Sequence, residues 1–501
     1  MGKLMCDALP SKFFENAPGA LHRTITLLIS SLILLVPCAV NGWPFVFPDS
    51  MEYLSGEPLI YRSYYYQVIA HGSLGIGVIW SGIWSLLLFQ AVLTSYVVYL
   101  FWRTVTQLKG FFIYLVIIIT IFTSVSYFVA LVMPDIFTSL MFLSMYMIVF
   151  RMMDLSRATI IFLLLVICFS IAFHASNLPI AVCLLVVGAA CLRLTGVDWL
   201  IVIRRLVVCA AAVLMAAGLA FASNAILHHW KTISGPGQVL LMANLIEGGP
   251  GLKYLQKTCQ TKSYAICQAF DQLPPRISAM DILWGSRGEK GILGQLGGFR
   301  GAYNEAAEIV RNTILSEPLA TARFLGFNFV RALRTTSPAA HIGSAEAYPW
   351  IPQMVGTLLG PRAYSSYMAS LQARGLWPVS VIAAANRIVL PLTWLGLLAL
   401  GIASWLLGDR DSCSLVAFVT AGYAANALIC SSVSGVHERY QARMTWLFML
   451  VMIAVGVHLY RLRAYRVIPA ASPTAERSVW HSARPPKAAL PSDEIVKRAI
   501  K

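Results

Sequence analysis

The stretch Thr24–Val40, TITLLISSLILLVPCAV, is followed closely by Phe47-Pro48-Asp49-Ser50-Met51-Glu52-Tyr53, so a long apolar run ends beside two acidic residues. About ten apolar runs of roughly 17–25 residues recur along the chain, each long enough to cross a hydrocarbon core as a helix. Of the 501 residues, 58% are hydrophobic and only 12% are charged, against about 25% charged in soluble proteins. The sequence predicts an all-α integral membrane protein with about ten transmembrane helices.

Basic residues in short loops predict the orientation of these spans. Lys3, Lys12 and Arg23 precede the first span, which ends at Pro37-Cys38 without a small-x-small cleavage site, so we expect a retained anchor and a cytoplasmic amino terminus. The alternation then places both termini in the cytoplasm. The predicted spans are Thr24–Val40, 76–102, 111–133, 136–150, 159–174, 178–194, 206–224, 388–407, 414–433 and 444–460.

Four regions follow from this layout. Residues 1–224 form a membrane domain with spans one to seven and an acidic first outer loop, 41–75. Residues 225–387, between the seventh and eighth spans, are predicted to form a mixed, mainly helical extracytoplasmic domain, with helices over Asn304–Leu315 and from Pro318. Residues 388–460 hold the last three spans, and the basic tail 461–501 is predicted to be disordered in the cytoplasm.

Three acidic residues beside predicted spans are candidates for catalysis. Asp49 and Glu52 lie three residues apart, so a helix would turn both carboxylates to one side. A carboxylate at the membrane rim could act as a general base on an acceptor hydroxyl. Asp135 follows Pro134 in another outer turn and could orient that base or hold a divalent cation. Helix capping is the alternative role for Asp49 and Asp135.

The densest polar cluster near a span is the segment Gly435–Arg443, which contains His437, Glu438, Arg439, Tyr440 and Arg443. In a helix, Arg439 and Arg443 share one face, where two guanidinium groups could bind phosphate oxygens. A collar of basic side chains at the lipid interface is the alternative interpretation. The outer turn with His174, Ser176 and Asn177 is a weaker candidate.

Two further features concern partners and compartment. The formal net charge is +16, but no nucleic-acid-binding motif accompanies it, so we expect no nucleic-acid partner. A basic outer domain suits anionic lipid headgroups or a phosphate-bearing substrate. Cys259 and Cys267 lie in the outer domain, where an oxidising compartment would permit a disulfide between them.

The acidic first outer loop, the second acid in the next outer turn and the long outer region before the last spans resemble the C-type (GT-C) glycosyltransferase superfamily. The resemblance implies transfer of a sugar from a polyprenyl-phosphate carrier to a glycan, lipid or protein acceptor on the extracytoplasmic face. It implies Asp49 as base, Asp135 as supporting acid or ligand of Mg²⁺ or Mn²⁺, and the His437–Tyr440 region at the donor phosphate. Ser50 and Met51 separate Asp49 from Glu52, whereas such acids are often adjacent in the family.

Other functions use the same outer face. A transporter or flippase of lipid-linked sugars is the main alternative, although transporters usually place ionisable sites near the bilayer midplane. A glycan polymerase or ligase, or an acyltransferase using His174 or His437, is a third possibility, but neither histidine has an evident partner in the sequence. The bacterial inner membrane is the expected location.

Overall fold

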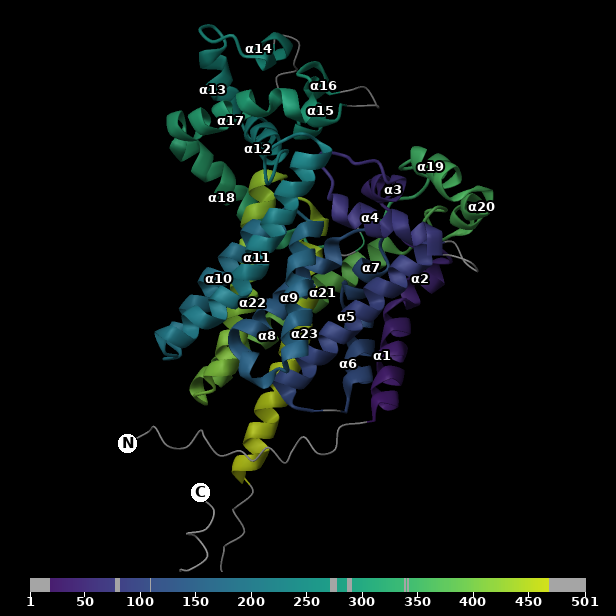
Figure 1. The fold of residues 1–501 in the computed structure, drawn as a ribbon, viewed down its shortest axis with the longest axis vertical. Coiled ribbons are helices and arrows are strands. Elements are labelled where there is room, and N and C mark those ends of the chain that lie inside the picture. Colours follow the sequence, from purple (N-terminus) through teal and green to yellow (C-terminus); the bar gives the residue numbers. More distant parts are fainter. Residues whose placement is uncertain are drawn as a thin grey trace, which may run out of the picture. The chain divides into compact units, whose positions relative to one another are not determined.

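The computed structural model describes residues 19–76, 82–108, 110–270, 277–285, 291–337, 339 and 342–467. Every named element in these ranges is helical (Figure 1), which confirms the predicted all-α class. The chain separates into a first unit, Met1–Gly456, and a second, Val457–Lys501, of which only the end of the last helix is described. Most of the predicted tail 461–501 therefore lies outside the described residues.

Seven helices in the described part of the chain are long and apolar enough to cross a membrane. The chain is thus a multispanning membrane protein by the length and composition of its helices. These helices are α5 (Ile83–Thr106), α8 (Asp135–Arg151, extended by the short helix η3, Met152–Asp154), α10 (Asn177–Leu194), α11 (Trp199–Leu227), α21 (Val379–Leu406), α22 (Arg410–Val433) and α23 (Glu438–Val467).

Three of the predicted spans correspond to shorter helices. They are α1 (Ala20–Leu34), α6 (Phe112–Phe122) and α9 (Arg157–Phe173). At about 1.5 Å per residue, the 11 residues of α6 reach roughly half the thickness of a hydrocarbon core. The span predicted over 111–133 is interrupted at Thr123-Ser124, where Ser124 Oγ donates to the carbonyl of Ala442 at 2.5 Å, and α7 (Val125–Val129) follows.

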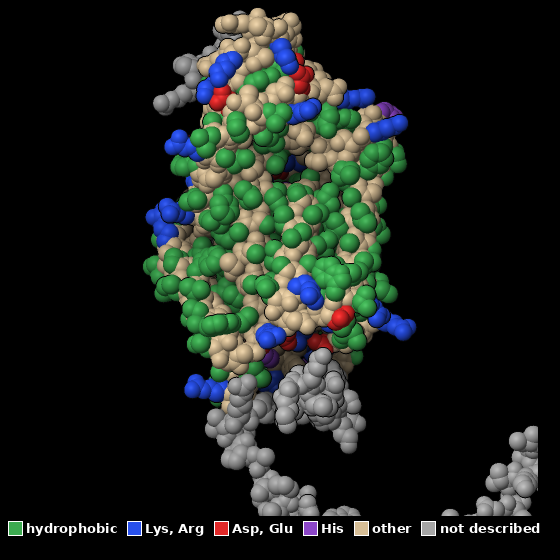
Figure 2. All heavy atoms as spheres, turned by 90° about the vertical axis from the view of Figure 1, so that its left-hand side faces the viewer, with side chains coloured by type: hydrophobic (Ala, Val, Ile, Leu, Met, Phe, Trp, Pro, Cys, Tyr) green, Lys and Arg blue, Asp and Glu red, His purple; other side chains and the backbone are tan. Residues whose placement is uncertain are grey.

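Burial differs strongly among the long helices. The most apolar stretch of α8 is 78% buried and that of α23 is 72% buried, whereas α11 and α21 bury only 22% and 17%. Figure 2 shows a broad hydrophobic band on the face of the molecule that carries α10 and α11. Helices α8 and α23 are therefore the most buried of the long helices, and they carry Asp135, Arg439 and Arg443, which are discussed below.

The region 225–387 is helical and has an apolar cluster of its own. Val239, Ile246 and Leu255 belong to this cluster, and Ala306 and Ile309 join it from α17. The helices are α12 (Gly237–Glu247), α13 (Pro250–Thr258), α14 (Ala265–Phe270), α15 (Ala279–Leu283), α16 (Ile292–Gln295), α17 (Gly298–Ser316), α18 (Pro318–Arg334), α19 (Trp350–Leu359) and α20 (Pro361–Ala369).

Helices α17 and α18 confirm the two helices predicted in this region, but the apolar face that the helical spacing of Ala307, Val310 and Ile314 predicts is partly wrong. Val310 is buried as expected, whereas Ile314 is 42% exposed. The buried stripe runs instead through Ala302, Ala306 and Ile309. Small side chains at two of these positions let α17 pack closely, a role that hydrophobicity alone does not mark.

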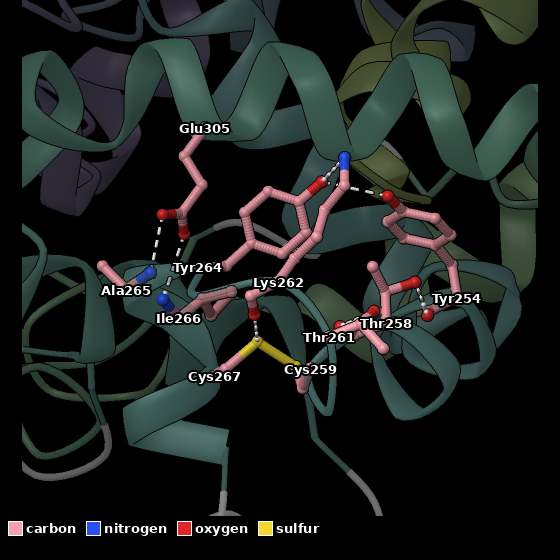
Figure 3. The surroundings of a disulfide bond; sticks show 10 residues. All are labelled: Tyr254, Thr258, Cys259, Thr261, Lys262, Tyr264, Ala265, Ile266, Cys267 and Glu305. Atoms are coloured by element: carbon pink, nitrogen blue, oxygen red, sulfur yellow. Dashed lines mark hydrogen bonds between the residues drawn. A yellow bond between two sulfur atoms is a disulfide. The ribbon is translucent and has the colours of Figure 1, made fainter.

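A disulfide joins Cys259 to Cys267 across the turn between α13 and α14 (Figure 3). Next to it, the Glu305 carboxylate on α17 accepts hydrogen bonds from the backbone N–H groups of Ala265, at 2.7 Å, and Ile266, at 3.0 Å. The turn is therefore fastened both covalently and through the start of α14, which an acceptor at a helix amino terminus stabilises.

The acidic loop 41–75 contains α3 (Pro48–Ser55) and α4 (Tyr64–Ser73), and α2 (Val36–Asn41) leads into it. An isolated parallel bridge holds this loop to the segment before α8. Phe45 N donates to the carbonyl of Ala130 at 3.1 Å, and Val132 N donates to the carbonyl of Phe45 at 3.2 Å. Both segments run on in the same direction, so Asp49 and Asp135 arrive at the same place four residues beyond the bridge.

Candidate active site

Local sequence fixes how each acid is presented. Pro48 opens α3, and Ser50 Oγ accepts a hydrogen bond from Phe47 N at 2.9 Å, which places Asp49 in the first helical turn. Asp135 is the first residue of α8, directly after Pro134. Acidic residues at helix amino termini interact favourably with the helix dipole. Neither acid is the N-cap residue, which is Phe47 in α3 and Pro134 in α8, so the capping alternative is wrong. Both acids lie in the first helical turn, and their side-chain partners decide what they do.

The two acids meet the arginines of α23. Arg439 Nη1 lies 3.2 Å from Asp49 Oδ2, and its Nε lies 3.8 Å from Asp135 Oδ1. Arg443 Nη1 lies 3.5 Å from the same Asp135 oxygen. Side chains from the first outer loop, α8 and the last helix thus form one network, although they are hundreds of residues apart in sequence. We call it the acid–arginine cluster: Asp49, Glu52, Arg62, Asp135, Arg439 and Arg443.

Arg62 joins this cluster without having been singled out by the sequence. Its Nη2 lies 2.6 Å from Asp49 Oδ1, and its Nε pairs with Glu52 Oε2. Burial by itself lowers the pKa of Arg62, but Asp49, Tyr53 and Glu52 outweigh this and raise it. Only the composition of the loop points to Arg62, because it is the only Lys or Arg in the acidic loop 41–75.

The exposure of the side chains in this cluster increases from a fully buried (dry) end to a partly exposed (open) end. The side chains of Asp135 and Arg443 have no exposed surface, those of Arg439 and Asp49 are 10% and 14% exposed, and Glu52 reaches 28%. Buried charges persist only where they are paired and hydrogen-bonded. Arg443 and Asp135 therefore form a rigid, buried ion pair, and the groups that a substrate could reach are Asp49, Glu52, Arg62 and Arg439.

Burial dominates the ionisation of Glu52 at the open end. It raises the pKa of this carboxyl above its usual value, and the opposing attraction of Arg62 does not cancel the shift. Tyr61 Oη donates to Glu52 Oε1 at 3.4 Å. The two carboxylates of α3 thus have different surroundings, since two guanidinium groups contact Asp49 and only one contacts Glu52.

Arg443 is locked by neutral groups as well as by Asp135. Its Nη2 donates to Asn426 Oδ1 at 2.9 Å and to Ser176 Oγ at 3.1 Å. Asn426 in turn donates through Nδ2 to the carbonyl of Tyr440 at 2.7 Å, one turn before Arg443. This hydrogen-bonded ring joins α22, α23 and the turn before α10, and it leaves Arg443 little freedom to follow a ligand.

Arg439 lies between two aromatic rings, whereas Arg443 contacts, among the described residues, only the Tyr440 ring, at 5.4 Å. The Arg439 guanidinium lies 4.6 Å from the centre of the Phe47 ring and 5.2 Å from that of Tyr440. Cation–π contacts hold such a group in place while leaving its N–H donors available to oxygen ligands. Of the two arginines on α23, Arg439 is therefore the one that can exchange a carboxylate for a phosphate oxygen.

The remaining predicted residues lie around Tyr440. His437 is 5.5 Å from the Tyr440 ring, and its Nε2 is 3.0 Å from the carbonyl of Ser434. Burial, followed by the charge of Arg439, lowers the pKa of His437. His174 lies on the other side, 6.4 Å from the ring.

The structure gives His174 the partner that was not evident in the sequence. Its Nδ1 lies 2.8 Å from Ser176 Oγ, and it also accepts the N–H of Ser176 at 3.4 Å. A histidine that accepts from the backbone two residues ahead is part of a local turn. Ser176 Oγ also accepts from Arg443, so the pair belongs to the arginine network.

The metal site suggested for Asp135 has no ready-made ligand set in the described residues, among which no group of three His, Cys, Asp or Glu side chains could hold a metal ion. Asp135 Oδ1 faces both arginines of α23. A divalent cation there would meet two positive charges at close range, which opposes its binding.

Comparisons with known proteins found no match: no protein-family model, no curated protein and no solved structure corresponds to this chain.

Proposed function

We propose that this protein is a membrane glycosyltransferase of the C type, moving a sugar from a polyprenyl-phosphate carrier to an acceptor hydroxyl on the extracytoplasmic face. The observation that supports this proposal most is the pair of contacts from Arg439 to Asp49 and Asp135. In an inverting transfer the base meets the acceptor on one face of the anomeric carbon and the cation meets the leaving phosphate on the opposite face, so the two groups must come from one site and flank the sugar between them.

In the proposed reaction, the acceptor oxygen attacks the anomeric carbon as the bond from that carbon to the phosphate oxygen breaks. The electron pair leaves with the phosphate, the acceptor proton passes to Asp49, and the configuration inverts. Arg439 moves its hydrogen bonds from Asp49 to the phosphate, which removes one of the two positive charges that stabilise the Asp49 carboxylate. Donor binding thereby frees a carboxylate oxygen of Asp49 to receive the acceptor proton.

The other members of the cluster position these two groups. Arg62 keeps Asp49 oriented through the 2.6 Å contact, and Arg443 holds Asp135 at the dry end. Glu52 pairs with Arg62 Nε and does not accept a proton from the substrate. A Mg²⁺ or Mn²⁺ ion at Asp135 would have to displace a guanidinium, so we propose that the arginines supply the positive charge without a metal.

The proposed topology has ten spans, with α1, α6 and α9 completing the seven long helices. The amino terminus and the tail lie in the cytoplasm, and region 225–387 lies outside. The bacterial inner membrane, the lipid-linked donor and a glycan, lipid or protein acceptor belong to the same proposal.

The first test uses purified protein in nanodiscs with a panel of polyprenyl-phosphate sugars and measures released polyprenyl phosphate by mass spectrometry. Asp49→Asn should reduce release by about 10²–10⁴-fold, the usual loss for a well-placed base. Glu57→Gln is the matched control, because Glu57 is an exposed acid of the same loop. Chelated and Mg²⁺-supplemented samples should give equal rates.

Release that survives Asp49→Asn would refute the base assignment. Movement of a lipid-linked sugar across proteoliposomes without any covalent product would replace the transferase by the transporter or flippase.

A further inference from the structure

A pocket of about 470 Å³ lies beside the acidic loop 41–75, and the proposed mechanism uses none of its lining residues. Its polar lining consists of Ser344, Gln372, Trp377 and Ser380, and its apolar lining includes Ile342 and Val379. None of the described residues that line it is charged. A volume in this range is usual for small-molecule sites.

The pocket wall is tied to the segment that leads into Asp49. Gln372 Nε2 donates to the carbonyl of Val46 at 2.7 Å, and Val46 N donates to Gln372 Oε1 at 3.2 Å. Gln372 N also donates to Asn41 Oδ1 at 2.7 Å. Val46 is three residues from Asp49, so the pocket and the acid–arginine cluster are fixed to the same short segment.

One donor in this wall has no partner. Trp377 Nε1 is buried and makes no hydrogen bond to any described residue. Buried donors are nearly always satisfied, so an orphan in a pocket wall indicates a missing acceptor. The Trp377 ring itself is held by Phe45, with ring centres 4.9 Å apart in an edge-to-face contact.

We propose that this pocket binds an uncharged sugar ring. An indole beside hydroxyl and amide groups, with no charge, suits a ligand that combines apolar C–H faces with many hydroxyl groups. A sugar hydroxyl would accept from Trp377 Nε1 and exchange hydrogen bonds with Ser344 and Ser380. The assignment rests on the proposed function for its context, and the ring belongs either to the lipid-linked donor or to the acceptor glycan.

Two variants test the pocket directly. Ser380→Trp fills it from α21, whereas Trp377→Phe keeps one aromatic ring beside Phe45 and removes the N–H donor together with the second ring of the indole. Ser366→Trp is the control, since Ser366 is an exposed residue of α20 that does not line the pocket. A cooperative thermal unfolding transition in each of the three variants should show that they are folded.

Saturation-transfer NMR on nanodiscs measures binding of free methyl glycosides of glucose, galactose, mannose, N-acetylglucosamine, rhamnose and arabinose. At least one should bind to wild type and to Ser366→Trp, lose its signal with Ser380→Trp, and bind at least about fivefold more weakly with Trp377→Phe, because one neutral hydrogen bond and part of the ring contact are lost. If no glycoside depends on both Ser380 and Trp377, the proposal is overturned.

This measurement does not need turnover, so it separates failure of the pocket from failure of the transferase. Titration with the active polyprenyl-phosphate sugar then distinguishes the two sources. A higher donor KM in Ser380→Trp assigns the ring to the donor, and an unchanged donor KM assigns it to the acceptor.

Discussion

Arg443 and Asp135 form the innermost pair of the acid–arginine cluster, and both side chains are fully buried. Removing one partner of a buried pair leaves an uncompensated charge, at a cost of about 3–5 kcal/mol. Arg443→Met should therefore lower the free energy of unfolding by about this amount, and Asp135→Asn combined with Arg443→Met should recover part of it. Denaturant titration in detergent micelles provides the measurement.

The other end of α8 offers a matched comparison. Arg151 pairs with Asp154 at 3.7 Å and with Asp411 at 3.1 Å, and both acids are more than half exposed. Exposed ion pairs contribute about 0–1 kcal/mol. Equal losses of unfolding free energy for Arg151→Met and Arg443→Met would contradict the distinction between a buried ion pair and a pair with exposed acids.

His437 gives a pH dependence whose sign follows from its surroundings. Burial and Arg439 lower its pKa in the folded protein, so the unfolded chain binds a proton more readily. Stability should then fall as the pH drops below about 6.5, the ordinary histidine value. His437→Gln should make the thermal midpoint less sensitive to acid between about pH 6.5 and 5. An unchanged slope would show that His437 is not the responsible group.

At the scale of elements, the turn between α3 and α4 depends on Gly56. Its φ of +74° lies in the left-handed region, and a Cβ there would lie 2.8 Å from His71 Cγ. Gly56→Ala should lower stability by about 1–3 kcal/mol, whereas Gly72→Ala should be neutral or stabilising by up to about 1 kcal/mol. Gly72 is the control because it lies within α4 with open space around its Cα. Thermal unfolding distinguishes the two, and similar midpoints would argue against a strained turn.

The elements also show where sequence reasoning stops. The all-helical class and the helices α17 and α18 follow from hydrophobic periodicity, which is a local property. The early end of α6 does not, because it depends on Ser124 reaching the carbonyl of Ala442, far away in the chain. Arg62 was missed for a similar reason: a single arginine acquires meaning only when two acids of α3 face it.

The predicted topology places Asp49 and Asp135 on the same side of the membrane, since both follow apolar runs that end on that side. Topology does not bring them within reach of the same guanidinium. The bridge between Phe45 and Leu131 does so, and it consists of backbone hydrogen bonds that leave no mark on residue type.

For the whole molecule, orientation is the property still to be measured. Alkaline phosphatase folds only where its disulfides form, outside the cytoplasm. Fused after Gly196, between α10 and α11, it should be inactive in cells, and fused after Thr261, between α13 and α14, it should be active. The opposite pattern would invert the proposed topology and move the acid–arginine cluster to the cytoplasmic face.

Tyr61 connects the region 225–387 to the acid–arginine cluster. Its ring packs on Trp284 and Phe299 of the outer region, with centres 5.0 Å and 5.4 Å away, and its hydroxyl holds Glu52. The side chain of Tyr61 therefore links the region 225–387 to the carboxylate of Glu52. A displacement of Trp284 and Phe299 would therefore be felt first at Tyr61, at its hydrogen bond to Glu52 and at the ion pair of Glu52 with Arg62.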